Sequence, residues 1–242
     1  MLTLYRLCGS GAQSVISAAQ MIMLEEAEVV VAGGMENLSQ APHVLREMRG
    51  TYKLGRPPTA GVEINKDMED YLFTNLRDDF VGYFMAQTSD ELCRRKGVLR
   101  EEADEFAAIS HQRTELSIKS GTWEQEIVEV ESESGIIGYK HEDHVVLGTT
   151  VESLSSLRTH FGPESLVTAG NASGVVDGAA AVVVKSSRRA DSDGDVPLAR
   201  IVSWGVVGIE PAIMAYGPVP SLSLIHISEP TRPERIGGGG VG

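Results

Sequence analysis

An almost uninterrupted run of hydrophobic side chains near the start of the chain predicts the first element of structure. Residues 15–24 read Val-Ile-Ser-Ala-Ala-Gln-Met-Ile-Met-Leu, so polar side chains occupy only two of these positions. A helix that is apolar around most of its circumference is typically buried. Glycines at positions 9 and 11 suit the opening turn, because they let another group approach the backbone closely. We therefore predict a buried helix over residues 10–25.

Short runs rich in apolar residues predict the strands. Residues 28–32 form a β-branched run that ends at Gly33-Gly34, which is typical of a buried strand in a mostly parallel sheet. Residues 3–7 and 179–185 are also predicted to be strands, the latter buried and closing the first domain. Because a helix between two strands is a βα unit, we predict the α/β class.

The rest of the pattern predicts two further helices and a change of domain. Helices are expected over residues 85–95 and 100–120, and the second begins with acidic and ends with basic residues, as the helix dipole favours. Residues 186–196 are polar and charged, which is typical of a linker. We expect a second domain to begin with a strand over residues 199–208.

The charge of the chain limits its partners. The 242 residues carry a formal net charge of −13 at pH 7. An overall field of this sign disfavours nucleic acid and anionic membranes, and we expect neither as a partner. No segment has the apolar length of a membrane-spanning helix. A ligand that carries phosphate groups would need a local basic patch.

The few cysteines and histidines predict neither a disulfide framework nor a metal site. Cys8 and Cys93 are isolated from each other, which favours a reducing compartment such as the cytoplasm. His141, Asp143 and His144 lie close together in the sequence, but no further group of ligands accompanies them. We interpret this stretch as a solvated loop and expect no metal.

Cys8 is the candidate nucleophile. It precedes the predicted helix, whose free N–H groups and positive dipole end favour an anion such as a thiolate. The thiolate is the reactive form of cysteine, and the same N–H groups could hold a carbonyl oxygen as negative charge develops on it. The alternative is a buried structural cysteine, and the spacing alone does not separate the two.

Three segments carry recognisable signatures in a fixed order. Residues 6–11 read Arg-Leu-Cys-Gly-Ser-Gly, followed by Glu-Val-Val-Val-Ala-Gly-Gly-Met-Glu-Asn at 28–37. Residues 167–174 read Val-Thr-Ala-Gly-Asn-Ala-Ser-Gly, followed by Asp-Gly-Ala-Ala-Ala at 177–181. Residues 210–218 read Glu-Pro-Ala-Ile-Met-Ala-Tyr-Gly-Pro. From about residue 3 to 221 the chain resembles thiolases, the acetyl-CoA acetyltransferases and 3-ketoacyl-CoA thiolases.

The resemblance implies a partial thiolase-like fold. It comprises the buried helix and mostly parallel sheet of the first half, an inserted loop domain and the start of the second half. The expected domains are a thiolase N-terminal domain at 1–190, incomplete at its start, with the loop domain at about 38–150, and the start of the C-terminal domain at 191–221. Residues 222–232 resemble a translated sequencing adapter, and the glycine run at 237–240 suits read-through, so we interpret residues 222–242 as an artefactual tail. The alternative is a natural disordered tail, which composition alone does not separate from it.

The resemblance also implies an activity. Thiolases form or cleave 3-ketoacyl-CoA, such as acetoacetyl-CoA or a longer chain, through an acyl group carried on a cysteine, here Cys8. Acyl-CoA and CoA would be the ligands, without a further cofactor, and the family assembles as homodimers or homotetramers. The resemblance assigns the pantetheine channel to Leu76, Met85, Ala169 and Ser173, the acyl pocket to Met214, and chain-length preference to Phe84, where many acetoacetyl-CoA-forming members have histidine.

Some family features are not found in these 242 residues. They are an Asn-Glu-Ala-Phe segment, a Gly-His-Pro histidine and a second catalytic cysteine. We therefore expect this chain alone to be an inactive fragment, truncated at both ends, that completes no thiolase turnover, although a slow acylation of Cys8 is compatible with it. The missing native start leaves mitochondria and peroxisomes open as compartments. The alternative function is a non-catalytic thiolase-like module that binds acyl-CoA or lipid. A nucleotide-binding loop is disfavoured, because Gly33-Gly34 precedes Met-Glu.

Overall fold

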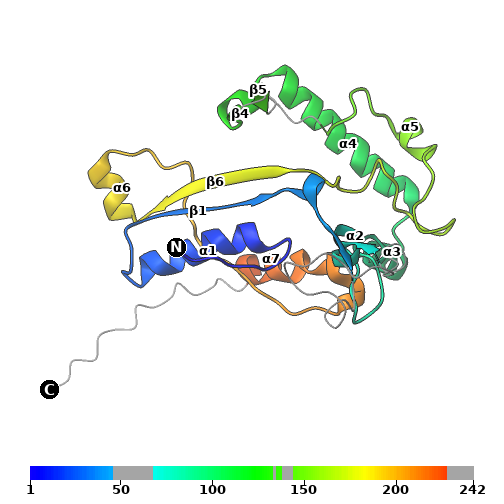
Figure 1. Cartoon of the computed structure of the whole chain (residues 1–242), viewed down its shortest axis with the longest axis horizontal. Helices are drawn as coiled ribbons and strands as arrows, with labels where there is room; N and C mark the ends of the chain where they lie inside the picture. The colour runs from blue at the N-terminus through cyan, green and yellow to red at the C-terminus, as the bar shows by residue number, and fades with distance from the viewer. Residues whose placement is uncertain (46–67, 133–134, 138–143, 228–242) are drawn as a thin grey trace, which may run out of the picture. The chain divides into compact units, whose positions relative to one another are not determined.

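The computed structural model describes residues 1–45, 68–132, 135–137 and 144–227. These residues form two compact units (Figure 1). Of the described residues, the first unit takes in 1–45, 68–75, 175–208 and 217–227, and the second takes in 76–132, 135–137, 144–174 and 209–216. Each unit is described by itself below. None of the described helices is long and apolar enough to cross a membrane.

The first unit is built around one helix and one pair of strands. Helix α1 (Ser10–Met23) packs along the pair formed by β1 (Val29–Glu36) and β6 (Gly178–Lys185), as Figure 1 shows. The unit also contains η1 (Leu38–Gln40), β2 (His43–Leu45), β3 (Met68–Asp70), α2 (Tyr71–Asn75), α6 (Ser187–Asp193) and α7 (Pro218–Ile227).

The α/β class and the helix that follows Cys8 are confirmed, but the mostly parallel sheet is not. β1 and β6 are antiparallel, with Val29 opposite Lys185 and Glu36 opposite Gly178, and the other strand pairs in the described ranges are antiparallel too. The chain passes through the second unit between β1 and β6. A connection of this length permits either strand direction, so the order of the elements along the chain does not decide it.

The expected burial of α1 is also only partly met. Ala18 and Ala19 are buried against the strands, whereas Met23 is 71% exposed. The strand pair covers one side of the helix and leaves the other side uncovered within the described residues. The same holds for the strands, because Val31 and its opposite residue Val183 remain exposed. Hydrophobic composition alone therefore overstated the burial of these elements.

Three predicted segments have a different conformation. Residues 3–7 make only an isolated bridge between Arg6 and Cys8, because Leu7 has a φ of 49° and ends the extended backbone. Residues 199–208 contain no strand. The predicted linker 186–196 contains α6, which is capped by the Ser186 hydroxyl accepting from the Arg189 N–H and which ends at Gly194 with a φ of 73°.

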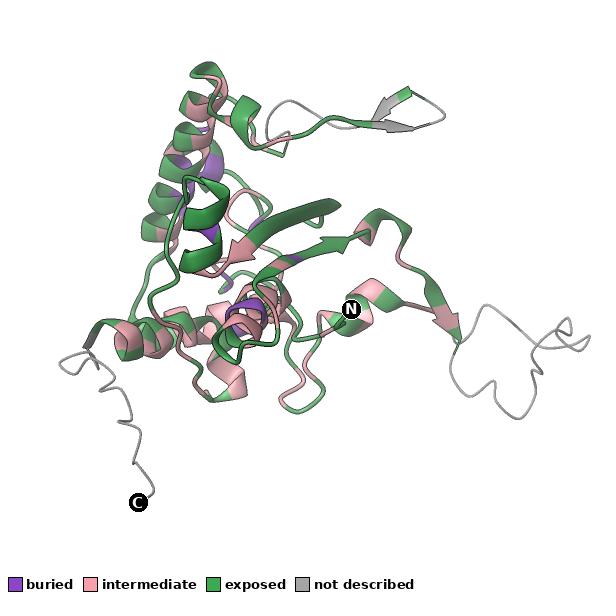
Figure 2. Ribbon diagram, turned by 90° about the vertical axis from the view of Figure 1, so that its left-hand side faces the viewer, coloured by how far each residue is buried: buried purple, intermediate pink, exposed green. Residues whose placement is uncertain are grey.

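The second unit is organised on a long helix. Its core joins Ala107 and Ala108 of α4 (Arg100–Lys119) to Leu154 of α5 (Val151–Ser155). Figure 2 shows the buried residues of this unit gathered along that helix. Its remaining elements are α3 (Met85–Lys96), η2 (Thr122–Gln125), β4 (Val130–Ser132), β5 (Gly135–Ile137) and η3 (Pro211–Tyr216). The helices predicted at 85–95 and 100–120 are thus confirmed within one residue at each end.

The loop domain predicted over about 38–150 falls partly outside the described residues, because 46–67 and 138–143 are not described. Of the predicted artefactual tail, residues 222–227 belong to α7 and residues 228–242 lie outside the described part. The domain boundaries 1–190, 191–221 and 222–242 therefore remain proposals.

Candidate active site

Cys8 lies in a tight turn immediately before α1. The turn is closed by the Gly9 N–H, which donates to the Arg6 carbonyl at 3.0 Å, and by the Ser10 N–H, which donates to the Leu7 carbonyl at 3.0 Å. Gly9 is the N-cap of α1, so the Cys8 side chain stands one residue ahead of the cap. This is the position at a helix N-terminus that the sequence predicts, and the side chain is exposed there.

The Ser10 hydroxyl fastens the same turn. It accepts from the Arg6 N–H at 2.7 Å and donates to the Leu7 carbonyl at 2.7 Å. The turn contains a strained residue, because Leu7 has a positive φ of 49°, a conformation that costs a non-glycine residue about 1–3 kcal/mol. A network that holds a residue in this state favours a functional role for the cysteine beside it. Sequence reasoning identified Cys8 but missed Leu7 and Ser10.

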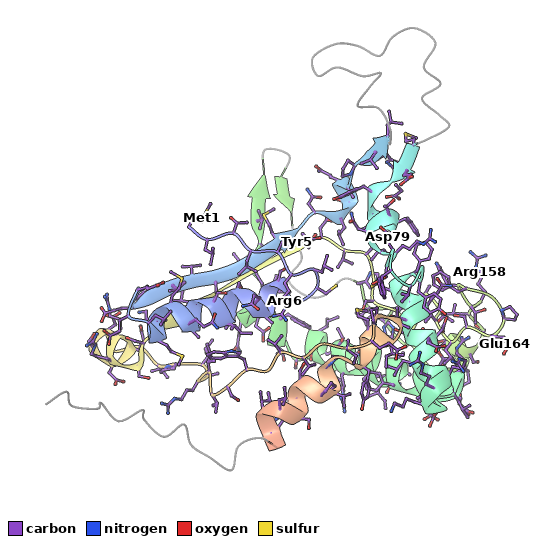
Figure 3. The ribbon with its side chains drawn as sticks, turned by 90° about the horizontal axis from the view of Figure 1, so that it is seen from below. Met1, Tyr5, Arg6, Asp79, Arg158 and Glu164 are labelled. Carbon is purple, nitrogen blue, oxygen red and sulfur yellow. The ribbon has the colours of Figure 1, made fainter. Side chains whose placement is uncertain are left out.

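A basic side chain is held at the start of the same helix. The Arg6 guanidinium donates to Gln13 Oε1 at 2.6 Å, so it is anchored on the first turns of α1. Figure 3 labels Tyr5 and Arg6 on the segment that leads into this helix. This contact ties the residue at the start of the Cys8 turn to the first turns of α1.

We expect Cys8 to react with iodoacetamide about tenfold faster than Cys93, or more. Cys8 is exposed, whereas Cys93 is half-buried on α3, and burial together with the nearby Asp90 carboxylate raises the pKa of the Cys93 thiol. Peptide mass mapping of the folded chain over time measures both rates. In urea the two rates should converge. Equal rates in the folded chain would remove the argument for a selectively reactive Cys8.

In the second unit, the structure brings Leu76 and Met85 together. The Met85 N–H donates to the Leu76 carbonyl at 2.8 Å, and Arg77 bridges to Phe84 one step further along. The loop between them is closed by the Asp78 carboxylate, which accepts from two backbone N–H groups. Two residues predicted to contact a pantetheine chain therefore sit side by side at the base of one rigid loop.

Phe84 belongs to an aromatic cluster. It is the N-cap of α3, and its ring stacks on the Phe161 ring with centroids 5.8 Å apart and planes inclined by 27°. The His160 ring packs edge-on against the Phe161 ring, with centroids 5.7 Å apart. Sequence reasoning missed His160 and Phe161, which lie far from Phe84 in the chain and carry no motif.

Ala169 and Ser173 flank a second rigid turn. Both are exposed. Asn171, midway between them in the sequence, forms hydrogen bonds to Thr168, Asp104 and Leu166 through its side-chain amide. Close packing explains why position 170 is a glycine, because a Cβ there would collide with the Leu154 side chain. This turn presents small, accessible residues on a fixed backbone, which suits close approach of an extended ligand.

A cavity of about 450 Å³ adjoins the end of this segment. It is lined by one face of α4 from Ala103 to Thr114, by Trp123, by His144 with Val145, and by residues 170–174. His111 Nε2 lies 3.2 Å from the Gly170 carbonyl oxygen, which braces the same turn from this side. Of the predicted ligand residues, only Ser173 lines this cavity.

Met214 lies on η3, and it is 40% exposed. η3 is held against α3 by a bidentate ion pair, in which the Arg95 guanidinium donates to both Glu210 oxygens at 2.6 and 2.7 Å. Lys96 Nζ also lies 4.8 Å from the centroid of the Tyr216 ring, within cation–π range. Glu210 is the first residue of the third sequence signature. An acidic side chain at this position pairs with Arg95 and thereby holds the segment against α3.

We expect the Arg95 pairs to make the stability of the second unit sensitive to acid. Arg94 and Arg95 hold the pKa of Glu91 at about 2, and Arg95 lowers the pKa of Glu210. Because both carboxyl pKa values are lowered on folding, this stabilisation is complete above the ordinary glutamate pKa of 4.5 and is lost as the pH falls toward 2. Urea unfolding followed by tryptophan fluorescence from pH 7 to 3 measures the loss.

The matched variants for this pH experiment are Arg95→Gln and Arg94→Gln. Arg95→Gln removes the contacts to both glutamates, so its stability should depend less steeply on pH between 4.5 and 3. Arg94→Gln keeps the Arg95–Glu210 pair and should retain more of the dependence. An unchanged pH profile in Arg95→Gln would contradict the assignment.

The predicted site residues are thus distributed over both units. Cys8 lies in the first unit, and the other six lie in the second, on the Leu76–Met85 loop, the turn of residues 168–173 and η3. For the histidine-rich loop, His141 and Asp143 lie outside the described residues. Within the part that is described, no group of three or more His, Cys, Asp or Glu side chains could hold a metal ion.

The fold and the Cys8 turn define a class of protein, an α/β domain with an exposed cysteine immediately before a helix. Within that class the chain belongs to the thiolase family, since the family model "Thiolase, N-terminal domain" matches residues 1–188. The sequence-based assignment to this family is therefore confirmed.

Known relatives support the same family. The chain is 40% identical to human mitochondrial 3-ketoacyl-CoA thiolase over 224 residues, which cover 92% of this chain and 54% of the relative. It is 39% identical to acetyl-CoA acetyltransferase of Rhizobium meliloti over 218 residues, which cover 89% of this chain and 53% of the relative. The chain therefore spans about half the length of the relatives it matches.

Solved structures show the same fold. Human mitochondrial 3-ketoacyl-CoA thiolase in complex with CoA has a TM-score of 0.79 at 39% identity, covering 91% of this chain and 53% of that one. Acetyl-CoA acetyltransferase of Bacillus anthracis has a TM-score of 0.81 at 34% identity, covering 93% of this chain and 56% of that one. The partial thiolase-like fold is thereby confirmed.

Proposed function

We propose that the protein is an acyl-CoA acyltransferase of the thiolase type, which forms or cleaves 3-ketoacyl-CoA through an acyl group carried on Cys8. The observation that carries the proposal is the exposed Cys8 in a strained, hydrogen-bonded turn at the N-terminus of α1. Membership of the thiolase family supports it, as do relatives named 3-ketoacyl-CoA thiolase and acetyl-CoA acetyltransferase.

In the proposed first step, Cys8 Sγ attacks the carbonyl carbon of an acyl-CoA thioester. The new C–S bond forms first and gives a tetrahedral oxyanion, while the thiol proton of Cys8 passes to solvent. The bond from the carbonyl carbon to the CoA sulfur then breaks, and the CoA thiolate takes up a proton from solvent. One thioester replaces another, so the step is close to balanced and reversible. The free N–H groups at the start of α1 would stabilise the oxyanion of the tetrahedral intermediate.

For the ligand, we propose that the Leu76–Met85 loop and the turn of residues 168–173 contact the pantetheine chain. The exposed Ala169 and Ser173 support this role, since small side chains admit an extended chain close to the backbone. We propose that Met214 contacts the acyl group and that Phe84 limits its length. A relative solved in complex with CoA supports CoA as the ligand class.

The test is acylation of the purified 242-residue chain by acetyl-CoA. We expect one acetyl group per chain on the Cys8 peptide by mass spectrometry, removable by hydroxylamine and by excess CoA, as a thioester requires. The assay isolates the first half-reaction, so it does not depend on residues that act only in carbon–carbon bond formation. No acetylation, or acetylation confined to Cys93 or to lysines, would overturn the proposal.

We further propose a homodimeric or homotetrameric protein that works in the cytoplasm. The assembly rests on the family resemblance and can be measured by light scattering at micromolar concentration. The compartment rests on the two unpaired cysteines, Cys8 and Cys93. Relatives include mitochondrial enzymes, so imaging of the tagged protein in its own cells would decide between the two compartments.

A further inference from the structure

A buried carboxylate lies behind the turn of residues 168–173. The Asp104 side chain is on α4 and is fully buried. Its Oδ2 accepts from Arg100 Nε at 2.7 Å, and its Oδ1 accepts from Asn171 Nδ2 at 3.0 Å. Burial of a charge is costly unless it is paired and hydrogen-bonded, so both partners are needed to hold it there.

The Asn171 side chain links the buried Asp104 carboxylate to the backbone of the turn. Its Oδ1 accepts from the Thr168 N–H at 2.8 Å, and its Nδ2 also donates to the Leu166 carbonyl at 2.8 Å. Because a carboxylate only accepts, Asp104 requires the amide nitrogen to face it, which leaves the amide oxygen for Thr168. The amide is therefore fixed in one orientation by three bonds.

The other end of the network reaches α5. Arg100 Nη2 donates to the carbonyl oxygens of Leu154 at 2.8 Å and Leu157 at 3.2 Å. The side chains of these two leucines are the ones that a Cβ at Gly170 would meet. One connected network thus fixes both the turn and the surface against which it packs, and none of its bonds involves Ala169 or Ser173.

From this geometry we infer that Asp104 is a positioning residue, which acts through Asn171 to hold Ala169 and Ser173 in the conformation that receives the acyl-CoA ligand. The inference rests on the proposed function for the identity of the ligand. Asp104 is buried and does not itself touch the ligand. Its role is to keep the backbone of residues 168–173 rigid before the ligand arrives.

The test exchanges the two partners. Asn171→Asp sets two carboxylates against each other, and Asp104→Asn sets two amide donors against each other. The double variant with both changes restores a donor and an acceptor across this contact, since the new amide at 104 can donate to the new carboxylate at 171. The Leu166 carbonyl, which accepts from Asn171 Nδ2 in the unmodified chain, loses that donor in Asn171→Asp and in the double variant, so the recovery is partial. Arg100 Nε keeps an acceptor in the double variant, and the Thr168 N–H does too. Glu115→Gln is the control, because it removes a carboxylate from the same helix that contacts Lys119 and Gly148 instead.

The first measurement needs no ligand. Amide hydrogen exchange of residues 168–173 should be faster in each single variant by about tenfold, the size expected for a lost buried hydrogen bond, and the double variant should exchange more slowly than Asn171→Asp, although it still lacks the bond to the Leu166 carbonyl. Exchange in α1 should not change. If residues 168–173 exchange at the original rate in both single variants, the inference is wrong.

The second measurement follows the rate of Cys8 acetylation against the concentration of acetyl-CoA. Each single variant should raise the half-saturating concentration about tenfold while the limiting rate and the iodoacetamide rate at Cys8 stay unchanged. The double variant should have a half-saturating concentration below that of Asn171→Asp, because it regains the contact between residues 104 and 171. A merely structural role predicts no such split, and equal losses in both parameters would overturn the inference.

The two proposals fail differently in these experiments. An unmodified chain that takes up no acetyl group would contradict the proposed function, while the exchange data would still decide whether Asp104 orders the turn. Normal acetylation of the unmodified chain, with single variants that order the turn less but keep the half-saturating concentration, would contradict the positioning role alone.

Discussion

We expect the Cys8→Ala variant to form no acyl-enzyme with acetyl-CoA, with a rate lower by a factor on the order of 10⁴ or more. The sulfur is the atom that bonds to the acyl carbon, and alanine leaves no nucleophile in the turn. The fold should survive, because the bonds that close the turn come from the backbone and the Ser10 hydroxyl rather than from the thiol. Intact-mass spectrometry after incubation with acetyl-CoA measures the loss.

Two controls accompany this variant. Cys93→Ala should be acetylated like the unmodified chain, because Cys93 is half-buried on α3 and its thiol pKa is raised. Cys8→Ser tests whether the position or the sulfur matters, and a hydroxyl without an adjacent base should react far more slowly than a thiolate. Acetylation of Cys8→Ala at the original rate would show that another residue is the nucleophile.

We expect Asp104→Ala to lower the free energy of unfolding of the second unit by roughly 3–5 kcal/mol, the range for removing one partner of a buried ion pair. Asp104 is fully buried, and the change leaves Arg100 Nε and one bond of Asn171 Nδ2 without their acceptor. It also leaves a void at a fully buried position of α4. Urea unfolding followed by circular dichroism and by tryptophan fluorescence reports the change.

The matched control for Asp104→Ala is Glu115→Ala, which shortens an acidic side chain on the same helix. Glu115 contacts Lys119 and the Gly148 N–H, and replacing it should leave the unfolding midpoint nearly unchanged. If the two variants unfold at the same urea concentration, the buried network does not stabilise the unit in the way proposed. Asp104→Asn should lie between them, because it keeps the volume of the side chain.

Local sequence determined much of the secondary structure. The helices at 10–23, 85–96 and 100–119 and the strand at 178–185 agree with predictions from apolar periodicity, acidic first turns and β-branched runs. These signals act within a few residues, so a linear pattern contains them. The capping residues of α6, Ser186 and Gly194, are local signals of the same kind. The polar composition of residues 186–196 nevertheless favours a linker, and that prediction is wrong.

The family and the candidate nucleophile were also determined by the sequence, because a signature such as Arg-Leu-Cys-Gly-Ser-Gly is contiguous. The remaining residues of the site carry weaker local signals. Leu76 and Met85 are nine positions apart, and only the resemblance pointed to them before the backbone bond between them was seen.

The tertiary structure alone decided how distant segments meet. The antiparallel pairing of β1 with β6, the stacking of Phe84 on Phe161 and the Arg95–Glu210 ion pair each join residues from separate parts of the chain. The same is true of Asp104 and Asn171, which look like a surface acid on a helix and a polar turn residue when read in sequence. Burial, strand direction and hydrogen-bond partners depend on which segments come together in space, and a pattern of nearest neighbours along the chain does not contain that information.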